Sequence, residues 1–151
     1  MKYCFMPLHG GTDDFMSPEN YERFYLPSLR KVVERELELG IVPYIFYEGK
    51  YQQRLEQIRD GLPKGTIGMF EQVDIVQARK ILDGHTCVCG NLPGALLAYG
   101  EPAKIVEETK KMIDACAPGG GFIMDCSIVM DHYKEENLDA WFETTMDYGK
   151  Y

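Results

Sequence analysis

Two patterns of hydrophobic and polar positions alternate along this chain. Short runs of β-branched and aromatic residues are each followed by a turn and then by apolar residues spaced three and four apart. The strand-like runs cover residues 3–8, 41–47, 66–70, 86–89 and 122–126, and helix-like segments follow them at about 18–39, 55–61, 73–82, 103–116 and 136–148. The alternation predicts an α/β fold with a parallel sheet of about five βα units.

The ends of these segments carry ordinary start and stop signals. Ser17 followed by Pro18 is typical of a helix start, and Gly40 is typical of the position just after a helix end. The three glycines at 119–121 form a hinge before the last strand-like run. Because no linker or shift of composition divides the chain, we expect a single domain over residues 1–151.

Five parallel units with no closing strand leave two open sheet edges and an apolar inner face, and such edges have to be paired or covered. A closed β/α barrel solves this problem with eight units in about 250 residues. An open, doubly wound sheet is the alternative, but no glycine-rich phosphate-binding fingerprint is present. We therefore interpret the chain as part of a barrel.

Composition and charge narrow the choice of partners. Apolar residues make up 45% of the 151 residues and charged residues 26%, as in globular proteins, and the net charge is −8 with basic residues scattered. This argues against nucleic acid as a partner. No apolar run reaches membrane-spanning length and no signal peptide begins the chain, so we expect a cytoplasmic protein without a membrane partner. The five cysteines are an odd number, which favours reduced thiols.

Polar side chains follow every predicted strand. In a β/α barrel the carboxyl ends of the strands converge on one open face, where functional groups lie. We therefore expect a site built from these residues: His9, Asp13, Asp14, Glu48, Glu71, Asp74, Cys89, Asn91, Asp125 and Cys126.

Several of these residues also have a structural interpretation. Glu71 and Asp74 have the place of first-turn helix acids, and Asp13 and Asp14 that of loop or N-cap residues. Cys87 and Cys89 resemble a metal-binding pair, but we expect no shared metal ion there without another pair of ligands. Cys126, at the end of the last strand, is the thiol that we single out as a candidate zinc ligand.

Several stretches in the same order resemble the uroporphyrinogen decarboxylase superfamily. They are residues 13–18 (DDFMSP), 25–27 (YLP), 73–78 (VDIVQA), 90–102 (GNLPGALLAYGEP), 105–107 (IVE), 120–124 (GGFIM), 136–138 (ENL) and 148–149 (YG). The resemblance covers nearly the whole chain. It implies the C-terminal portion of a (β/α)8 TIM barrel that lacks the N-terminal strands.

The resemblance implies two chemistries: decarboxylation of uroporphyrinogen without a cofactor, and zinc-assisted methyl transfer between a corrinoid protein and a thiol. In the methyltransferase branch, zinc is held by a His-x-Cys before a glycine and by a cysteine on the last strand. The matching positions here are Phe46, Glu48 before Gly49, and Cys126. By this resemblance Glu48, Cys126 and either His9 or Glu71 would hold zinc, while Asn91 and either Asp13 or Asp14 would orient the substrate.

By the same resemblance, the decarboxylase branch uses a histidine near the end of the last strand and basic residues in its N-terminal part. The histidine position falls on Cys126 and the basic residues have no counterpart, while a charge of −8 suits an octa-carboxylate substrate poorly. We therefore favour methyl transfer between a corrinoid protein and a small molecule. The alternatives are uroporphyrinogen decarboxylation and a non-catalytic half-barrel that only self-associates. In each case we expect a homo-oligomer or a missing N-terminal half to complete the barrel.

Overall fold

The sheet consists of five parallel strands that are paired in the order of the chain. The computed structural model describes residues 2–150, and the sheet order is β1-β2-β3-β4-β5. Consecutive order with every pair parallel is the arrangement of a β/α barrel segment and differs from the reversed order of a doubly wound sheet. The strands are β1 (Lys2–Leu8), β2 (Ile41–Lys50), β3 (Thr66–Gln72), β4 (Thr86–Cys89) and β5 (Phe122–Ile123).

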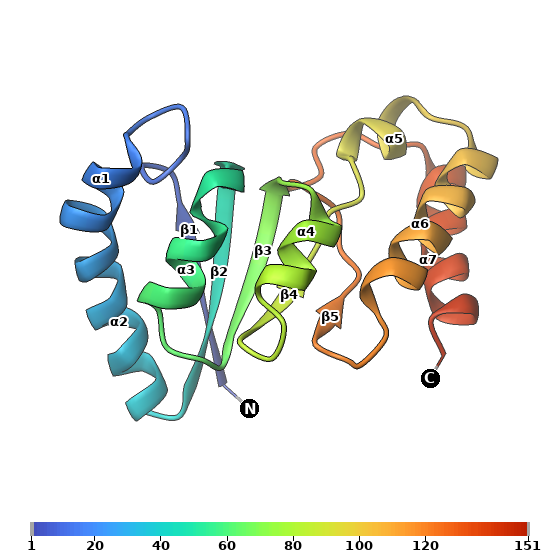
Figure 1. Cartoon of the computed structure of the whole chain (residues 1–151). Coiled ribbons are helices and arrows are strands. Elements are labelled where there is room, and N and C mark those ends of the chain that lie inside the picture. The colour runs from blue at the N-terminus through green and yellow to red at the C-terminus, as the bar shows by residue number, and fades with distance from the viewer. Residues whose placement is uncertain (1, 151) are drawn as a thin grey trace.

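The helices form a second layer on one face of the sheet (Figure 1). The main core lies between these two layers and contains Ile45, Tyr47 and Phe70 of the strands. A second core joins the last three helices to the segments after β4 and β5. The helices are α1 (Pro18–Asn20), α2 (Leu26–Glu38), α3 (Leu55–Gly61), α4 (Ile75–Ile81), α5 (Gly94–Tyr99), α6 (Pro102–Cys116) and α7 (Glu135–Tyr148), with a π-helical turn at Tyr21–Tyr25 and a 3-10 turn at Gln52–Arg54.

The predicted helix signals act as expected. The Ser17 hydroxyl accepts a hydrogen bond from the Asn20 N–H at 3.3 Å, and Pro18 occupies the first position of α1. Gly40 follows α2 with a φ of 70°, a conformation that favours glycine. Asp74 caps α4, because its Oδ1 accepts from the Val76 and Gln77 N–H groups at 3.0 Å each. Asp74 is thus the N-cap of α4 and lies just before the first turn, where the sequence analysis placed it.

The last strand is shorter than predicted, and the fifth helix lies where the sequence pattern assigned no element. Regular pairing of β5 stops at Ile123, and only an isolated bridge joins Leu92 to Cys126 beyond it. The Asp125 side chain accepts the Cys126 N–H at 2.8 Å, a local bond that competes with the ladder. Helix α5 fills the connection between β4 and α6.

The two faces of the sheet carry different residues because strand side chains alternate. Phe46, Met69 and Cys89 are paired neighbours on the face away from the helices, with Tyr44 and Ile67 in contact. We call this surface the inner face. At the first strand its side chains remain open: Tyr3 is 56% exposed and Phe5 54%. The helix-covered face is thus packed, while the inner face is partly bare.

Among residues 2–150 we find no helix whose length and apolar content would let it cross a membrane.

The capping role of Asp74 leads to a stability prediction. Replacing Asp74 by Ala leaves two N–H groups of α4 without their partner and is expected to lower the free energy of unfolding by about 1 kcal/mol. Urea denaturation followed by circular dichroism measures this change. Asp139→Ala, at an exposed position of α7, is the control and is expected to leave the unfolding midpoint unchanged. An equal effect of both substitutions would contradict the assignment.

Candidate functional site

The carboxyl ends of the strands meet at one edge of the sheet, the upper edge in Figure 1. There, His9 directly follows β1 and Glu48 lies near the end of β2. The Nδ1 atom of His9 lies 2.7 Å from Oε2 of Glu48. Two residues that the sequence analysis proposed for one site are therefore brought together. The pair is open to solvent, with side chains 68% and 44% exposed.

Glu71, at the end of β3, is tied to the same edge. Its Oε2 accepts the Gly49 N–H at 2.6 Å, and its Oε1 accepts the Gln72 side-chain amide at 3.1 Å. Gly49 is held at a φ of 89° where the register shifts between Tyr47 and Lys50. A side chain there would also approach Thr12 to 2.9 Å. Glycine is therefore required at position 49. We call the group of His9, Glu48 and Glu71 the rim.

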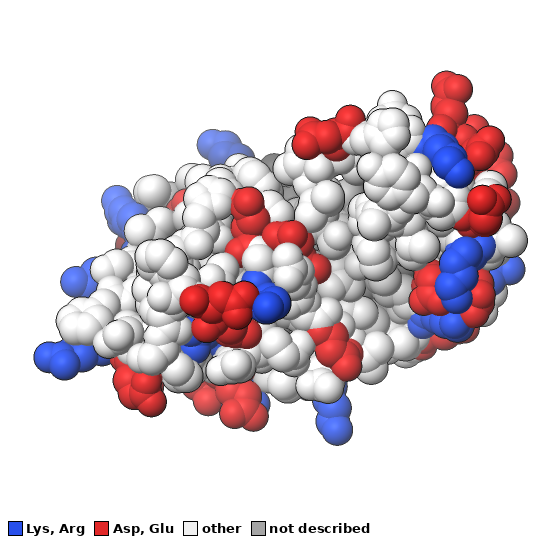
Figure 2. All heavy atoms as spheres, turned by 90° about the horizontal axis from the view of Figure 1, so that it is seen from above, with Lys and Arg blue, Asp and Glu red and all other residues white. Residues whose placement is uncertain are grey.

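Figure 2 shows the molecule from this end of the sheet. Acidic side chains lie in the middle of the view, and most Lys and Arg side chains lie toward its two ends. Of the basic residues close to the rim, Lys50 forms an ion pair with Asp14 at 3.0 Å, and Arg54 is fully buried.

Asp13 is a structural residue. Its Oδ1 lies 3.6 Å from Nε of Arg54, and its Oδ2 accepts the Gln53 N–H at 3.0 Å, with both charged side chains almost fully buried. Arg54 also donates to the carbonyls of Gly11, Thr12 and Met16. Asp13 therefore neutralises the guanidinium that holds the loop after β1. Asp14 points to solvent against Lys50 and lies outside this arrangement.

Asn91 lies at the end of β4 but its side chain serves the backbone. Its amide donates to the carbonyl of Val73 at 3.0 Å and to that of Glu71 at 3.4 Å. These bonds hold the connection between β3 and α4 beside the rim. Asn91 is thus placed to position Glu71.

Cys126 lies apart from the rim. Its thiol donates to the Ile128 carbonyl at 2.9 Å, and it is packed among Leu92, Leu97, Ile105 and Trp141 on the helix side. The isolated bridge puts Cys126 beside Leu92, and both side chains pack in the core of the last three helices. Burial raises the pKa of this thiol. Among residues 2–150 no three His, Cys, Asp or Glu side chains come together as metal ligands.

A second group of polar side chains lies on the inner face, and sequence reasoning missed how it forms. The Tyr44 hydroxyl donates to Oδ2 of Asp125 at 3.1 Å, and the Cys89 thiol donates to the same oxygen at 3.2 Å. Tyr44 and Cys89 are themselves 3.2 Å apart. Burial, above all, raises the pKa of both groups, so they remain protonated donors. We call Tyr44, Cys89 and Asp125 the inner-face cluster.

The sequence analysis includes Asp125 and Cys89 among the polar residues expected at strand ends. Tyr44 lies in the middle of β2, and its hydroxyl reaches past β3 to β4 and to the segment after β5. The pattern of the sequence holds no signal for this diagonal contact.

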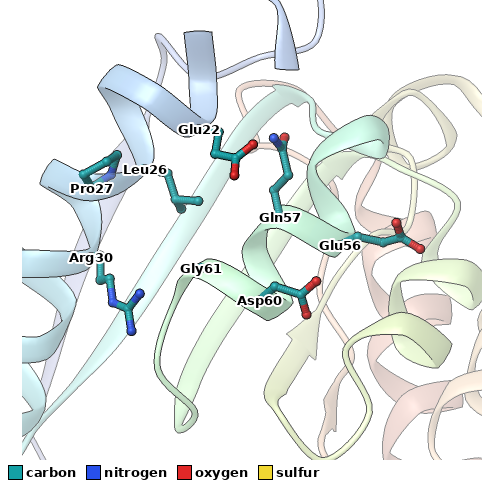
Figure 3. Close-up of a pocket in the computed structure, with 8 residues that line it drawn as sticks. All are labelled: Glu22, Leu26, Pro27, Arg30, Glu56, Gln57, Asp60 and Gly61. Atoms are coloured by element: carbon teal, nitrogen blue, oxygen red, sulfur yellow. The ribbon is translucent and has the colours of Figure 1, made fainter. Parts of the chain in front are cut away.

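The cavities of the surface lie elsewhere. One of about 470 Å³ lies on the helical side, between α3 and the helical segment of residues 21–38, and its lining includes Glu22, Arg30, Gln57 and Asp60 (Figure 3). Another, of about 720 Å³, lies toward the amino ends of the strands and includes Tyr3, Ile67 and Cys87. Neither includes a rim residue.

Comparisons with known proteins match most of this chain to one family. A family model described as uroporphyrinogen decarboxylase (URO-D) matches residues 7–148. Uroporphyrinogen decarboxylase of Trichodesmium erythraeum (strain IMS101) is 29% identical over 140 residues, which are 87% of this chain and 37% of that protein. The methylcobamide:CoM methyltransferase MtbA of Methanosarcina acetivorans is 31% identical over 117 residues, covering 73% of this chain and 33% of that protein.

A solved structure gives the same result for the fold. A methyltransferase from Methanosarcina mazei superposes with a TM-score of 0.78 at 18% identity, covering 99% of this chain and 43% of that one. The predicted fold, part of a β/α barrel, is therefore confirmed. The chain spans about a third of the length of the two curated relatives described above.

The buried pair of Asp13 and Arg54 leads to a prediction about stability. Asp13→Ala leaves the buried guanidinium without its carboxylate and is expected to cost about 3 kcal/mol of unfolding free energy. The neighbouring substitution Asp14→Ala removes only an exposed ion pair and is expected to cost less than about 0.5 kcal/mol. Chemical denaturation of the two variants measures both values. Similar losses in the two variants would show that Asp13 has no special structural role.

The arrangement of donors leads to a prediction about zinc. A catalytic zinc site uses three protein ligands, but within residues 2–150 such side chains adjoin in twos, as His9 does with Glu48 and Cys89 with Asp125. We expect the chain, dialysed against zinc and then passed through a desalting column, to retain much less than one equivalent by elemental analysis. Cys126→Ala is expected to leave that amount unchanged. One equivalent of zinc that is lost in Cys126→Ala would restore the site expected from the sequence.

Proposed function

The chain belongs to the uroporphyrinogen decarboxylase (URO-D) family, and we propose that it supplies the substrate-facing part of a methyltransferase that works with a corrinoid protein. The likeness to the Methanosarcina acetivorans methyltransferase and to the Methanosarcina mazei structure supports this branch of the family. In this proposal the rim binds the small molecule that exchanges its methyl group.

The observation that carries the proposal is the charge of the rim. Glu48 and Glu71 face the open end of the sheet, while Lys50 is paired with Asp14 and Arg54 is buried under the loop after β1. A substrate with several carboxylates is repelled by such a surface unless cations offset its charge. The rim therefore favours a neutral or cationic substrate over uroporphyrinogen.

The pair of His9 and Glu48 provides a proton at the rim. Glu48 accepts from Nδ1 of His9, which orients the imidazole and leaves Nε2 as the nitrogen that exchanges a proton with the substrate. The corrinoid of the partner protein supplies the cobalt that takes up or returns the methyl group. When the methyl group leaves, the substrate atom keeps the electron pair of the broken bond, and His9 is placed to give that atom the Nε2 proton. In the opposite direction Nε2 takes the proton from a thiol.

Zinc is not part of this proposal. His9 and Glu48 are two ligands, and Cys126 lies on the other side of the sheet layer, so these residues do not make the three-ligand set. The other residues proposed from the sequence have supporting roles: Asp13 holds Arg54, and Asn91 positions Glu71.

The bare inner face requires a cover for this activity. We propose that the remaining strands come from a preceding segment or from a second copy of the chain, because Tyr3 and Phe5 are more than half exposed on that face. Light scattering on the purified chain shows whether self-association provides it.

The proposal is tested with methylcobalamin as donor and a panel of thiols as acceptors, followed by the absorbance of the corrinoid. Loss of the proton-transferring imidazole in His9→Ala is expected to lower the rate roughly 10²-fold. His132→Ala, an exposed histidine beside Tyr99, is the matched control and is expected to keep the rate. Turnover of uroporphyrinogen without methyl transfer would contradict the proposal in favour of decarboxylation. A dimer that performs neither reaction would contradict it in favour of a purely structural half-barrel.

A further inference from the structure

The backbone that carries His9 is held by side chains from the turn after β2. The ladder between β1 and β2 ends at Leu8, so His9 is the first residue beyond it. The Tyr51 hydroxyl donates to the Leu8 carbonyl at 3.2 Å. Two residues after His9, the carbonyl of Gly11 accepts from Nε of Arg54 at 3.2 Å. His9 therefore lies between two carbonyls that buried side chains of one turn hold in place.

The Tyr51 hydroxyl is itself confined. Tyr51 is fully buried, and its ring meets that of Tyr47 edge-on with centroids 5.1 Å apart. Burial, above all, raises the pKa of the hydroxyl, so it stays protonated and acts as a donor. A methyl group at Gly11 would come within 2.8 Å of the hydroxyl oxygen, so glycine at position 11 lets the loop close over it. The hydroxyl is thus fixed beside the Leu8 carbonyl.

The contact between His9 and Glu48 is too open to hold itself. Nδ1 of His9 lies 2.7 Å from Oε2 of Glu48, but the two side chains are 68% and 44% exposed. Such a pair contributes little free energy, because water competes for both groups and both side chains lose rotational freedom. The contact therefore depends on how firmly the backbone on each side is held.

Tyr51 joins the two sides of this contact. It follows Glu48 by three residues along the chain, directly after the end of β2. Its hydroxyl, at the far end of the side chain, holds the carbonyl next to His9. A single buried side chain thus spans the two strand ends that meet in the pair.

We propose that Tyr51 is a positioning residue for His9 in proton transfer. It holds the Leu8 carbonyl so that Nδ1 of His9 stays on Glu48 and Nε2 remains the nitrogen that exchanges the proton. The role in proton transfer rests on the proposed function, whereas the hold of Tyr51 on the contact between His9 and Glu48 does not depend on it.

The test uses two variants that make the same chemical change. Tyr51→Phe removes the hydroxyl and keeps the ring. Tyr47→Phe is the matched control, because Tyr47 is equally buried and its ring stacks on Phe70, but its hydroxyl has no hydrogen-bond partner within residues 2–150. Circular dichroism checks that both variants are folded.

The first measurement is the tautomer of His9, followed by NMR through the nitrogen chemical shifts of the ring at a pH where the imidazole is neutral. The signals of His9 are those absent from His9→Ala. In the wild-type chain and in Tyr47→Phe, the hydrogen bond to Glu48 is expected to keep the proton on Nδ1. In Tyr51→Phe the ratio of the Nδ1–H to the Nε2–H form is expected to fall about threefold. A wild-type ring without preference for Nδ1–H, or equal ratios in the two variants, would overturn the inference.

The second measurement is methyl transfer from methylcobalamin to a thiol. Because Tyr51 acts through His9 and not on the substrate, Tyr51→Phe is expected to lower kcat about threefold and to keep the KM for the thiol, whereas Tyr47→Phe keeps both. In a His9→Ala background, Tyr51→Phe is expected to cause no further loss. An equal loss in that background would show that Tyr51 does not act through His9.

The outcomes separate this inference from the proposed function. A changed tautomer ratio in a chain that transfers no methyl group would sink the methyltransferase proposal and leave the hold of Tyr51 on His9 standing. Methyl transfer that is equally fast in the wild-type chain and in Tyr51→Phe would do the reverse.

Discussion

Each strand of this protein runs parallel to the next and pairs with its neighbour in sequence, so all five strands end at the same edge. Together with the alternation of side chains, this pairing decides which face every residue occupies. Phe46, Met69 and Cys89 share one layer of the inner face because their strands are in register. Residues two positions further along the same strands, Glu48 and Glu71, then reach the rim. The chemistry available to the chain follows from this register.

The same rule explains what the sequence could and could not predict. The five βα units, the capping by Ser17, and the glycine at position 40 follow from local patterns that the structure confirms. The pairing of His9 with Glu48 follows from parallel strands that end together. Asp125 and Cys126 both follow the last strand in the sequence, but neighbouring residues of an extended segment point to opposite sides, and Asp125 contacts Tyr44 whereas Cys126 packs against the helices.

Other features depend on contacts between distant segments, which no local pattern encodes. Asp13 is nearly buried because Arg54, from the turn after β2, enters the loop after β1. Asn91 serves two backbone carbonyls of a different connection. The Tyr44 hydroxyl reaches Asp125, which is 81 residues away in sequence. The sequence therefore predicts which residues at a strand end are polar. Whether such a side chain stabilises the fold or is available for chemistry depends on its contacts with distant segments.

Arg54 has a consequence for how this part of the barrel can change. Its guanidinium binds the carbonyls of Gly11, Thr12 and Met16, which lie on the far side of α1 and α2 in sequence. The two connections that frame His9 and Glu48 are thereby joined across the whole first βα unit. A recombination event with a breakpoint between residues 17 and 53 would bring together a loop and an arginine that had not evolved with each other. We would expect natural chimeras of this fold to inherit residues 9–54 as one exchangeable block.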